Sequence, residues 1–136
     1  MIKTFNRAVD ADLKIVASTA FTTTATSTPV AISSVGAGEE DLGIMLNVTL
    51  LDGTHDGSNY YTVEVKAGET SGGTFYPIAS ILSTDTELGA NLLSINTREI
   101  VDAVGSDNAA YYEVTVTKTG STATGITLEA YFVKGV

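Results

Sequence analysis

Several segments of this chain alternate between apolar residues and residues that are mostly polar, and this period of two constrains the fold more than any other feature. The clearest segments are 44–50, 61–66, 112–117 and 126–132. Successive side chains of a β-strand point to opposite faces of the sheet, so the apolar members of each segment share one face. Clusters of Gly, Asp, Asn and Ser, the residues typical of turns, separate the segments. The pattern predicts sheets that each bury one face.

The spacing of these segments predicts an all-β protein, a jelly-roll-like antiparallel β-sandwich of about eight strands. We expect long strands near 43–51, 60–67, 74–82, 110–118 and 124–134, an edge strand around Pro29, and a further strand at 91–95. Asn96 to Glu99 reads as a capping box that opens a short helix, which Gly105 would end. The predicted core residues are Leu46, Val48, Val63, Val65, Val114, Val116, Leu128 and Phe132.

The first 16 residues mix apolar and charged side chains and are predicted to form an extended N-terminal arm, with a single sandwich domain at 17–136. An arm cannot bury all of its apolar side chains in its own domain. We therefore predict that it contacts a partner, and the predicted contact residues are Phe5, Arg7, Leu13 and Ile15.

Composition argues against most chemical functions. The 136 residues include no cysteine and only one histidine, so thiolate metal sites, cysteine nucleophiles and histidine-rich zinc sites are excluded. The formal net charge is −9 and the seven basic residues are scattered, which does not favour nucleic-acid binding. No segment approaches the length of a membrane span or of a signal-peptide core. We expect no enzymatic activity and no cofactor.

Three clusters have residue types that are found in binding or catalytic sites. Residues 52–57 place Asp52, Thr54 and Asp56 like the first ligands of a calcium loop, but Val63 stands where the bidentate Glu belongs. The glycines at 36, 38, 68, 72 and 73 lack the Lys-Ser or Lys-Thr of a phosphate loop. The acidic run 39–41 and both of these clusters are interpreted as solvated turns, with calcium left as an open question.

The six tyrosines are the best argument for sugar binding, since sugars stack on exposed rings. Strand alternation predicts that one ring of the pair Tyr60 and Tyr61, and one of the pair Tyr111 and Tyr112, points into the core. Asn47 begins a glycosylation sequon, which has no meaning without secretion.

Four stretches together resemble a known family. They are the Thr-rich segment before Pro29-Val30-Ala31-Ile32, the entry Asp41-Leu42-Gly43 to a long strand, the strand Tyr112-Glu113-Val114-Thr115-Val116, and the terminal Leu128-Glu129-Ala130-Tyr131-Phe132-Val133. This combination resembles the jelly-roll capsid cement proteins of tailed bacteriophages, as in the Bordetella phage type.

The resemblance implies a decoration protein that forms a homotrimer, binds the outer surface of the virion at local threefold positions and bridges neighbouring major capsid subunits. It also implies assembly in the bacterial cytoplasm, and it carries over no catalytic residues. Two other classes stay open: a carbohydrate- or receptor-binding module of a phage tail or fibre, and a pilus-like or surface-layer subunit, which should carry an export signal.

Overall fold

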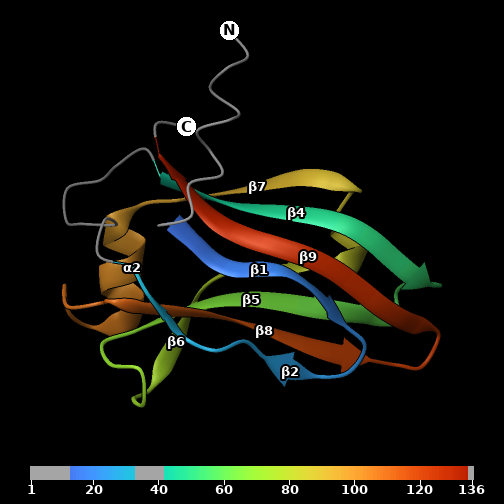
Figure 1. Cartoon of the computed structure of the whole chain (residues 1–136), viewed down its shortest axis with the longest axis horizontal. Coiled ribbons are helices and arrows are strands. Elements are labelled where there is room, and N and C mark those ends of the chain that lie inside the picture. Colours follow the sequence, from blue (N-terminus) through green and yellow to red (C-terminus); the bar gives the residue numbers. More distant parts are fainter. Residues whose placement is uncertain (1–12, 33–41, 135–136) are drawn as a thin grey trace, which may run out of the picture.

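The computed structural model describes residues 13–32 and 42–134, which form two antiparallel β-sheets packed face to face (Figure 1). Sheet A contains, in spatial order, β1 (Lys14–Phe21), β9 (Ala123–Lys134), β4 (Leu42–Gly53) and β7 (Gly89–Ile95). Sheet B contains β2 (Ala25–Thr26) and β3 (Val30–Ala31), which both pair with β8 (Tyr111–Thr119), followed by β5 (Tyr60–Gly68) and β6 (Phe75–Leu82).

The strand order is that of a jelly roll. The first strand, β1, pairs with the last, β9, and the chain then crosses repeatedly between the two sheets. The short strands β2 and β3 pair with different parts of β8 and together occupy one strand position. The described residues thus form nine strands in eight positions. The predicted all-β, jelly-roll-like sandwich of about eight strands is confirmed.

The core lies between the sheets and contains most of the residues that the alternating pattern placed on a buried face. Leu50 is an exception at 46% exposed, because the pairing of β4 with β9 shifts register between Val48 and Leu50. All eight predicted core side chains are at most 1% exposed. Within each sheet the apolar residues are in register, for example Ile44 opposite Phe132 and Val65 opposite Val114. The rings of Tyr112 in sheet B and Phe132 in sheet A meet edge to face, with centroids 4.9 Å apart. The two sheets therefore share one continuous apolar layer.

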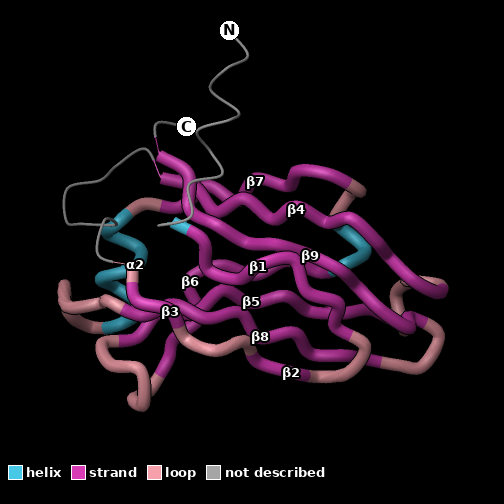
Figure 2. Tube along the Cα trace, in the orientation of Figure 1, coloured by secondary structure: helices cyan, strands magenta, loops and turns pink. Residues whose placement is uncertain are grey.

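The segment between β6 and β8 contains the helical turns. A 3-10 turn, η2 (Ser83–Asp85), precedes β7, and the helix α2 (Thr97–Val104) follows it at one end of the sandwich (Figure 2). The predicted capping box is present: the Glu99 amide donates to the Asn96 side chain at 2.9 Å, and the Asn96 amide donates to the Glu99 carboxylate at 3.1 Å. The helix ends at Gly105, whose φ of 86° is left-handed. Neither helical segment of the described chain is long and apolar enough to cross a membrane.

The structure differs from the expected boundary of the N-terminal arm. Strand β1 begins at Lys14, so residues 14–16, which the sequence assigned to the arm, belong to sheet A. Ile15 is only 1% exposed and is part of the core, and Leu13 packs against the same cluster. The reason is tertiary, because β9 offers a strand edge that this short apolar run can join.

Candidate functional site

A groove runs along β1 at one open side of the sandwich. Its volume is about 560 Å³, and we call it the β1 groove. Strand β1 forms one wall, and the turn and short strands from Thr22 to Val30 form the other. The lining side chains are those of residues 15–17, 19–23, 25–28 and 30. None of them is ionisable, and most are Ala, Ser or Thr. The β1 groove therefore suits an uncharged, extended segment better than a charged small molecule.

Hydroxyl side chains join the segment that borders the β1 groove to strand β8. The Lys118 amide donates to the Thr24 hydroxyl at 3.0 Å, and the Val114 amide donates to the Ser27 hydroxyl at 2.9 Å. The two hydroxyls, which lie directly before and directly after the two-residue strand β2, accept β8 amides where the backbone pairing of β2 with β8 ends. The Tyr61 hydroxyl donates to the Thr22 carbonyl at 3.0 Å and ties the turn after β1 to the core. This explains why the edge segment is rich in Thr and Ser.

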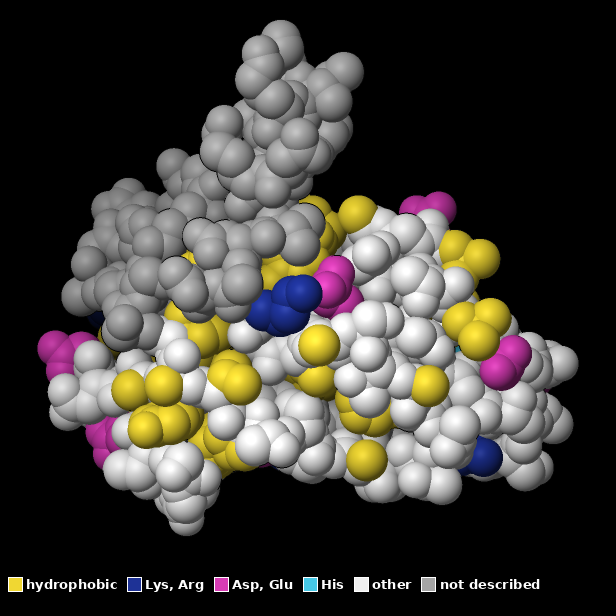
Figure 3. Space-filling view, in the orientation of Figure 1, with side chains coloured by type: hydrophobic (Ala, Val, Ile, Leu, Met, Phe, Trp, Pro, Cys, Tyr) yellow, Lys and Arg dark blue, Asp and Glu magenta, His cyan; other side chains and the backbone are white. Residues whose placement is uncertain are grey.

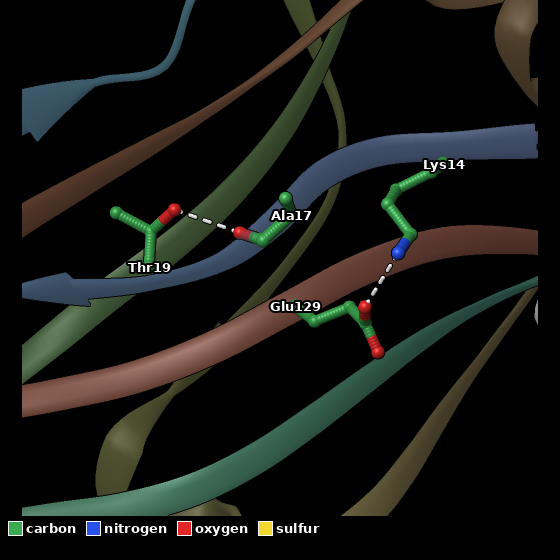
Figure 4. A network of polar contacts seen from close by, with 4 residues as sticks. All are labelled: Lys14, Ala17, Thr19 and Glu129. Carbon is green, nitrogen blue, oxygen red and sulfur yellow. Dashed lines mark hydrogen bonds and ion pairs between the residues drawn. The ribbon is translucent and has the colours of Figure 1, made fainter. Parts of the chain in front are cut away.

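Strand β1 has one partner among the described residues, which is β9. Figure 4 shows two polar contacts along it. The Lys14 ammonium lies 2.8 Å from the Glu129 carboxylate on β9, and the Thr19 hydroxyl donates to the Ala17 carbonyl at 2.7 Å. The positive charge of Lys14 is thus directed across the outer face of its own sheet. Within residues 13–32 and 42–134, no strand pairs with the opposite backbone edge of β1.

The four predicted contact residues differ in where they lie in the structure. Phe5 and Arg7 lie outside the described residues, whereas Leu13 and Ile15 lie at the start of β1. Ile15 lines the β1 groove with a side chain that is only 1% exposed, so it offers a partner almost no surface. The exposed residues of the groove, such as Ala17 and Ala25, were not singled out by the sequence. A signal was present, because residues 15–38 contain no ionisable side chain.

The only histidine of the chain lies beside a serine, and this His–Ser pair resembles two members of the catalytic triad of a hydrolase. His55 Nδ1 lies 2.7 Å from Ser83 Oγ, and Nε2 lies 2.9 Å from the Asp52 carbonyl. Ser83 is only 1% exposed, and its oxygen also accepts the Tyr61 amide at 3.0 Å. A nucleophile must reach its substrate, so this buried and already bonded serine is a structural anchor.

In the loop 52–57, the Asp56 carboxylate forms hydrogen bonds with nearby residues of the chain. Asp56 Oδ1 accepts hydrogen bonds from the Asn59 side chain and from the amides of Ser58 and Asn59, each at 2.9 Å. These bonds, led by that of the Asn59 side chain, lower the pKa of the Asp56 carboxyl. Val63, at the twelfth position, is buried in the core. Among residues 13–32 and 42–134, no group of three His, Asp or Glu side chains is placed to hold a metal ion.

The remaining sequence candidates are mostly turns and core residues. Gly68 ends β5 and Gly72 and Gly73 lie in the turn before β6, while Gly36, Gly38 and the acidic run 39–41 lie outside the described residues. Tyr61 and Tyr112 are buried and Tyr60 and Tyr111 are half-buried, as the alternation predicted.

Tyr76 is the most exposed tyrosine of the described chain, at 39%. It lines a small pocket of about 180 Å³ together with Glu69, Thr70, Gly73, Thr74 and Val104. Such a pocket is small for an extended ligand.

Three exposed leucines lie on or directly before the strands β4 and β7, which are on the opposite side of sheet A from β1. Leu88, directly before β7, is 66% exposed, Leu92 on β7 is 47% exposed, and Leu50 on β4 is 46% exposed. Leu92 lies opposite Met45, so it belongs to the outer face of the sheet. Figure 3 shows hydrophobic side chains in several small, separate patches on this face of the molecule, with few charged side chains among the atoms that are coloured. Exposed leucines in this number mark a candidate contact surface.

Comparison with known proteins adds no family assignment. No known protein-family model matches the sequence, and no curated protein matches it significantly.

Proposed function

We propose that this chain is a capsid decoration protein of a tailed bacteriophage, which binds the outer surface of the shell and stabilises it by bridging major capsid subunits. The observation that carries the proposal is a jelly roll with the β1 groove, an uncharged groove along an edge strand. A molecule with these features is suited to binding other proteins through its surface.

Two further observations support this function. The sequence resembles jelly-roll capsid cement proteins over most of its length, and the fold has the jelly-roll strand order that the resemblance implies. The net charge of −9 favours dispersal of a protein that is made in many copies.

The physical advantage of such a protein comes from repeated contacts. A homotrimer at a local threefold position offers three identical surfaces to the surrounding shell subunits. Each contact buries little area alone, but linking three contacts raises the overall affinity by avidity. The bridging molecule then resists separation of the subunits when packaged DNA presses on the shell.

The direct test uses shells of the phage that encodes this chain, prepared without it. We expect the purified protein to co-sediment with these shells, to saturate at a fixed copy number and to raise the temperature at which the shells disrupt. Electron microscopy of decorated shells should place it outside the shell at local threefold positions. Protein that stays in the supernatant at saturating concentration would contradict the proposal.

A carbohydrate-binding module is the second candidate, and the observation that favours it is the exposed ring of Tyr76 beside Glu69 and Thr70. A glycan array with the wild type and with Tyr76→Ala tests it. Specific glycan binding that the substitution abolishes would favour this alternative over the decoration protein.

A further inference from the structure

The two sheets differ in how well their edge strands are protected from pairing with another chain. In sheet B, β6 carries Pro77 and a register shift, and the opposite edge consists of two-residue strands with Pro29 between them. Proline, bulges and very short strands are the usual means by which proteins prevent an edge from pairing with another chain. Sheet B is therefore protected at both edges.

Sheet A has less of this protection, since the only such feature at its edges in the described chain is the pair of register shifts between β1 and β9. Its edge strands β1 and β7 are eight and seven residues long and contain no proline. The pairing of β7 with β4 shows no register shift, and residues 88–97 include no ionisable side chain. Within the described residues, β7 pairs only with β4 and β1 pairs only with β9.

The only charged residue of β1, Lys14, is not placed to prevent another strand from pairing with this edge. A lysine that projects from an edge strand normally discourages pairing because an incoming strand would have to desolvate it. Here the Lys14 ammonium is held by Glu129 at 2.8 Å on the neighbouring β9 (Figure 4). The rest of β1, from Ile15 to Phe21, is uncharged and shows two register shifts toward β9.

Charge indicates where two copies of this chain can meet. Each copy has a formal net charge of −9, so two copies repel each other on average. The edges formed by β1 and β7 are uncharged along almost their whole length, and they lie at opposite sides of the same sheet. Contact through these edges avoids the repulsion.

We propose that copies of this chain join edge to edge, with β7 of one copy adding to β1 of the next. This inference rests on the proposed homotrimer, because a threefold ring needs a contact between two different surfaces of each copy. The strands of sheet A alternate in direction, so β1 and β7 run in opposite directions and their junction is antiparallel. Three copies of sheet A then form one closed ring that leaves no open edge.

The side chains at both edges fit this junction. The β1 groove leaves open space beside β1, and its exposed lining residue Ala17 is small. The incoming β7 brings Leu92, with Leu88 directly before it, and their exposed apolar surface would be removed from water. Backbone hydrogen bonds supply the pairing, and the leucines add apolar burial.

The test uses two matched variants of the full chain, Ala17→Glu on β1 and Ala90→Glu on β7. Both residues are exposed alanines on edge strands of the same sheet, so the fold should tolerate either change. Thr117→Glu, an exposed position on β8 of sheet B, is the control for added charge. Sedimentation velocity measures assembly, and the thermal transition checks the fold of each variant.

We expect the wild type and Thr117→Glu to be trimers, and each edge variant alone to be a monomer, with assembly weakened by at least about tenfold. An equimolar mixture of the two edge variants should form dimers that cannot close, because one copy keeps an intact β7 and the other an intact β1. This complementation does not depend on the exact register of the junction.

Other outcomes overturn the inference in distinguishable ways. If Ala90→Glu alone still associates while Ala17→Glu does not, β1 pairs with itself and the ring is wrong. If both variants remain trimers that decorate shells, the edges are not used, although the proposed function stands. If the wild type is a monomer and does not bind shells, the inference and the proposed function both fail.

Discussion

His55 Nδ1 lies 2.7 Å from Ser83 Oγ, and this contact joins the loop after β4 to the turn η2 and to β5. Because His55 Nε2 faces the Asp52 carbonyl, which only accepts, the neutral ring carries its proton on Nε2 and accepts the Ser83 hydroxyl at Nδ1. The Ser83 oxygen in turn accepts the Tyr61 amide at 3.0 Å. One buried hydroxyl thus satisfies two groups from different elements.

Replacing Ser83 with alanine should therefore destabilise the fold. The Tyr61 amide and His55 Nδ1 would both lose their partner, and leaving a buried polar group unpaired costs about 1–3 kcal/mol. Urea unfolding measures the loss, with Ser80→Ala, an exposed serine on β6, as the control. Equal unfolding midpoints for the two variants would show that the contact contributes nothing.

Replacing Val114 with aspartate should prevent folding. Val114 is 0% exposed and faces Val65 across the β5–β8 pair, so the new carboxylate would enter an apolar layer without a partner. Such burial costs several kcal/mol, which is comparable to the stability of a small domain. Solubility and circular dichroism test this, and Thr117→Asp on the exposed face of the same strand should fold normally. A soluble, cooperative Val114→Asp protein would be incompatible with the core described above.

Replacing Asn96 with alanine should destabilise α2 by about 1 kcal/mol, because the variant loses the side-chain oxygen that accepts the Glu99 amide and keeps only the bond from the backbone amide of residue 96 to the Glu99 carboxylate. Thermal unfolding provides the measurement. Asn108→Ala, at an exposed position after the helix, is the matched control and should have little effect. An Asn96 variant as stable as the Asn108 variant would refute the role of the cap.

The protein should lose stability at alkaline pH. Burial raises the pKa of Tyr112 from 10.0 to about 12, so between these values the folded state holds a proton that the unfolded state has released. The stability that this proton gives is fully present below pH 10 and is lost as the pH rises toward 12, by roughly 2–3 kcal/mol in total. Burial also raises the pKa of Tyr61 and Tyr131, which adds to the loss.

The Tyr112→Phe variant isolates this contribution. Urea unfolding at pH 8, 10 and 11 should show a shallower decline for the variant than for the wild type. Parallel declines would mean that the Tyr112 hydroxyl does not titrate with folding.

Deleting residues 1–12 should leave the described fold nearly intact. All of the strand pairs of the described sandwich lie within residues 14–134, so the thermal transition should change little. We expect weaker trimerisation or shell attachment, because Phe5 and Arg7 are among the predicted contact residues. The arm hypothesis is wrong if the truncated protein fails to fold, or if it assembles and decorates shells as tightly as the full chain does.

The sequence alone determined the local structure of this protein. Alternation with a period of two depends only on the geometry of a strand, so it identified the long strands and the buried faces of Val63, Val114 and Phe132. The capping box is likewise a contact between residues three apart, Asn96 and Glu99, and could be predicted from their spacing.

Only the tertiary structure decided which faces and edges are covered. Glu113 and Thr115 alternate with core residues and should face solvent, yet each is only 9% exposed. Thr26 on β2 meets Thr115 at 3.0 Å, and burial raises the pKa of Glu113 while Lys66, opposite it on β5, lowers it. In the same way, Ile15 joins the core only because β9, more than 100 residues later, pairs with β1. Periodicity gives the direction of each side chain, but the partner that covers it comes from a distant part of the chain, and only the folded arrangement brings the two together.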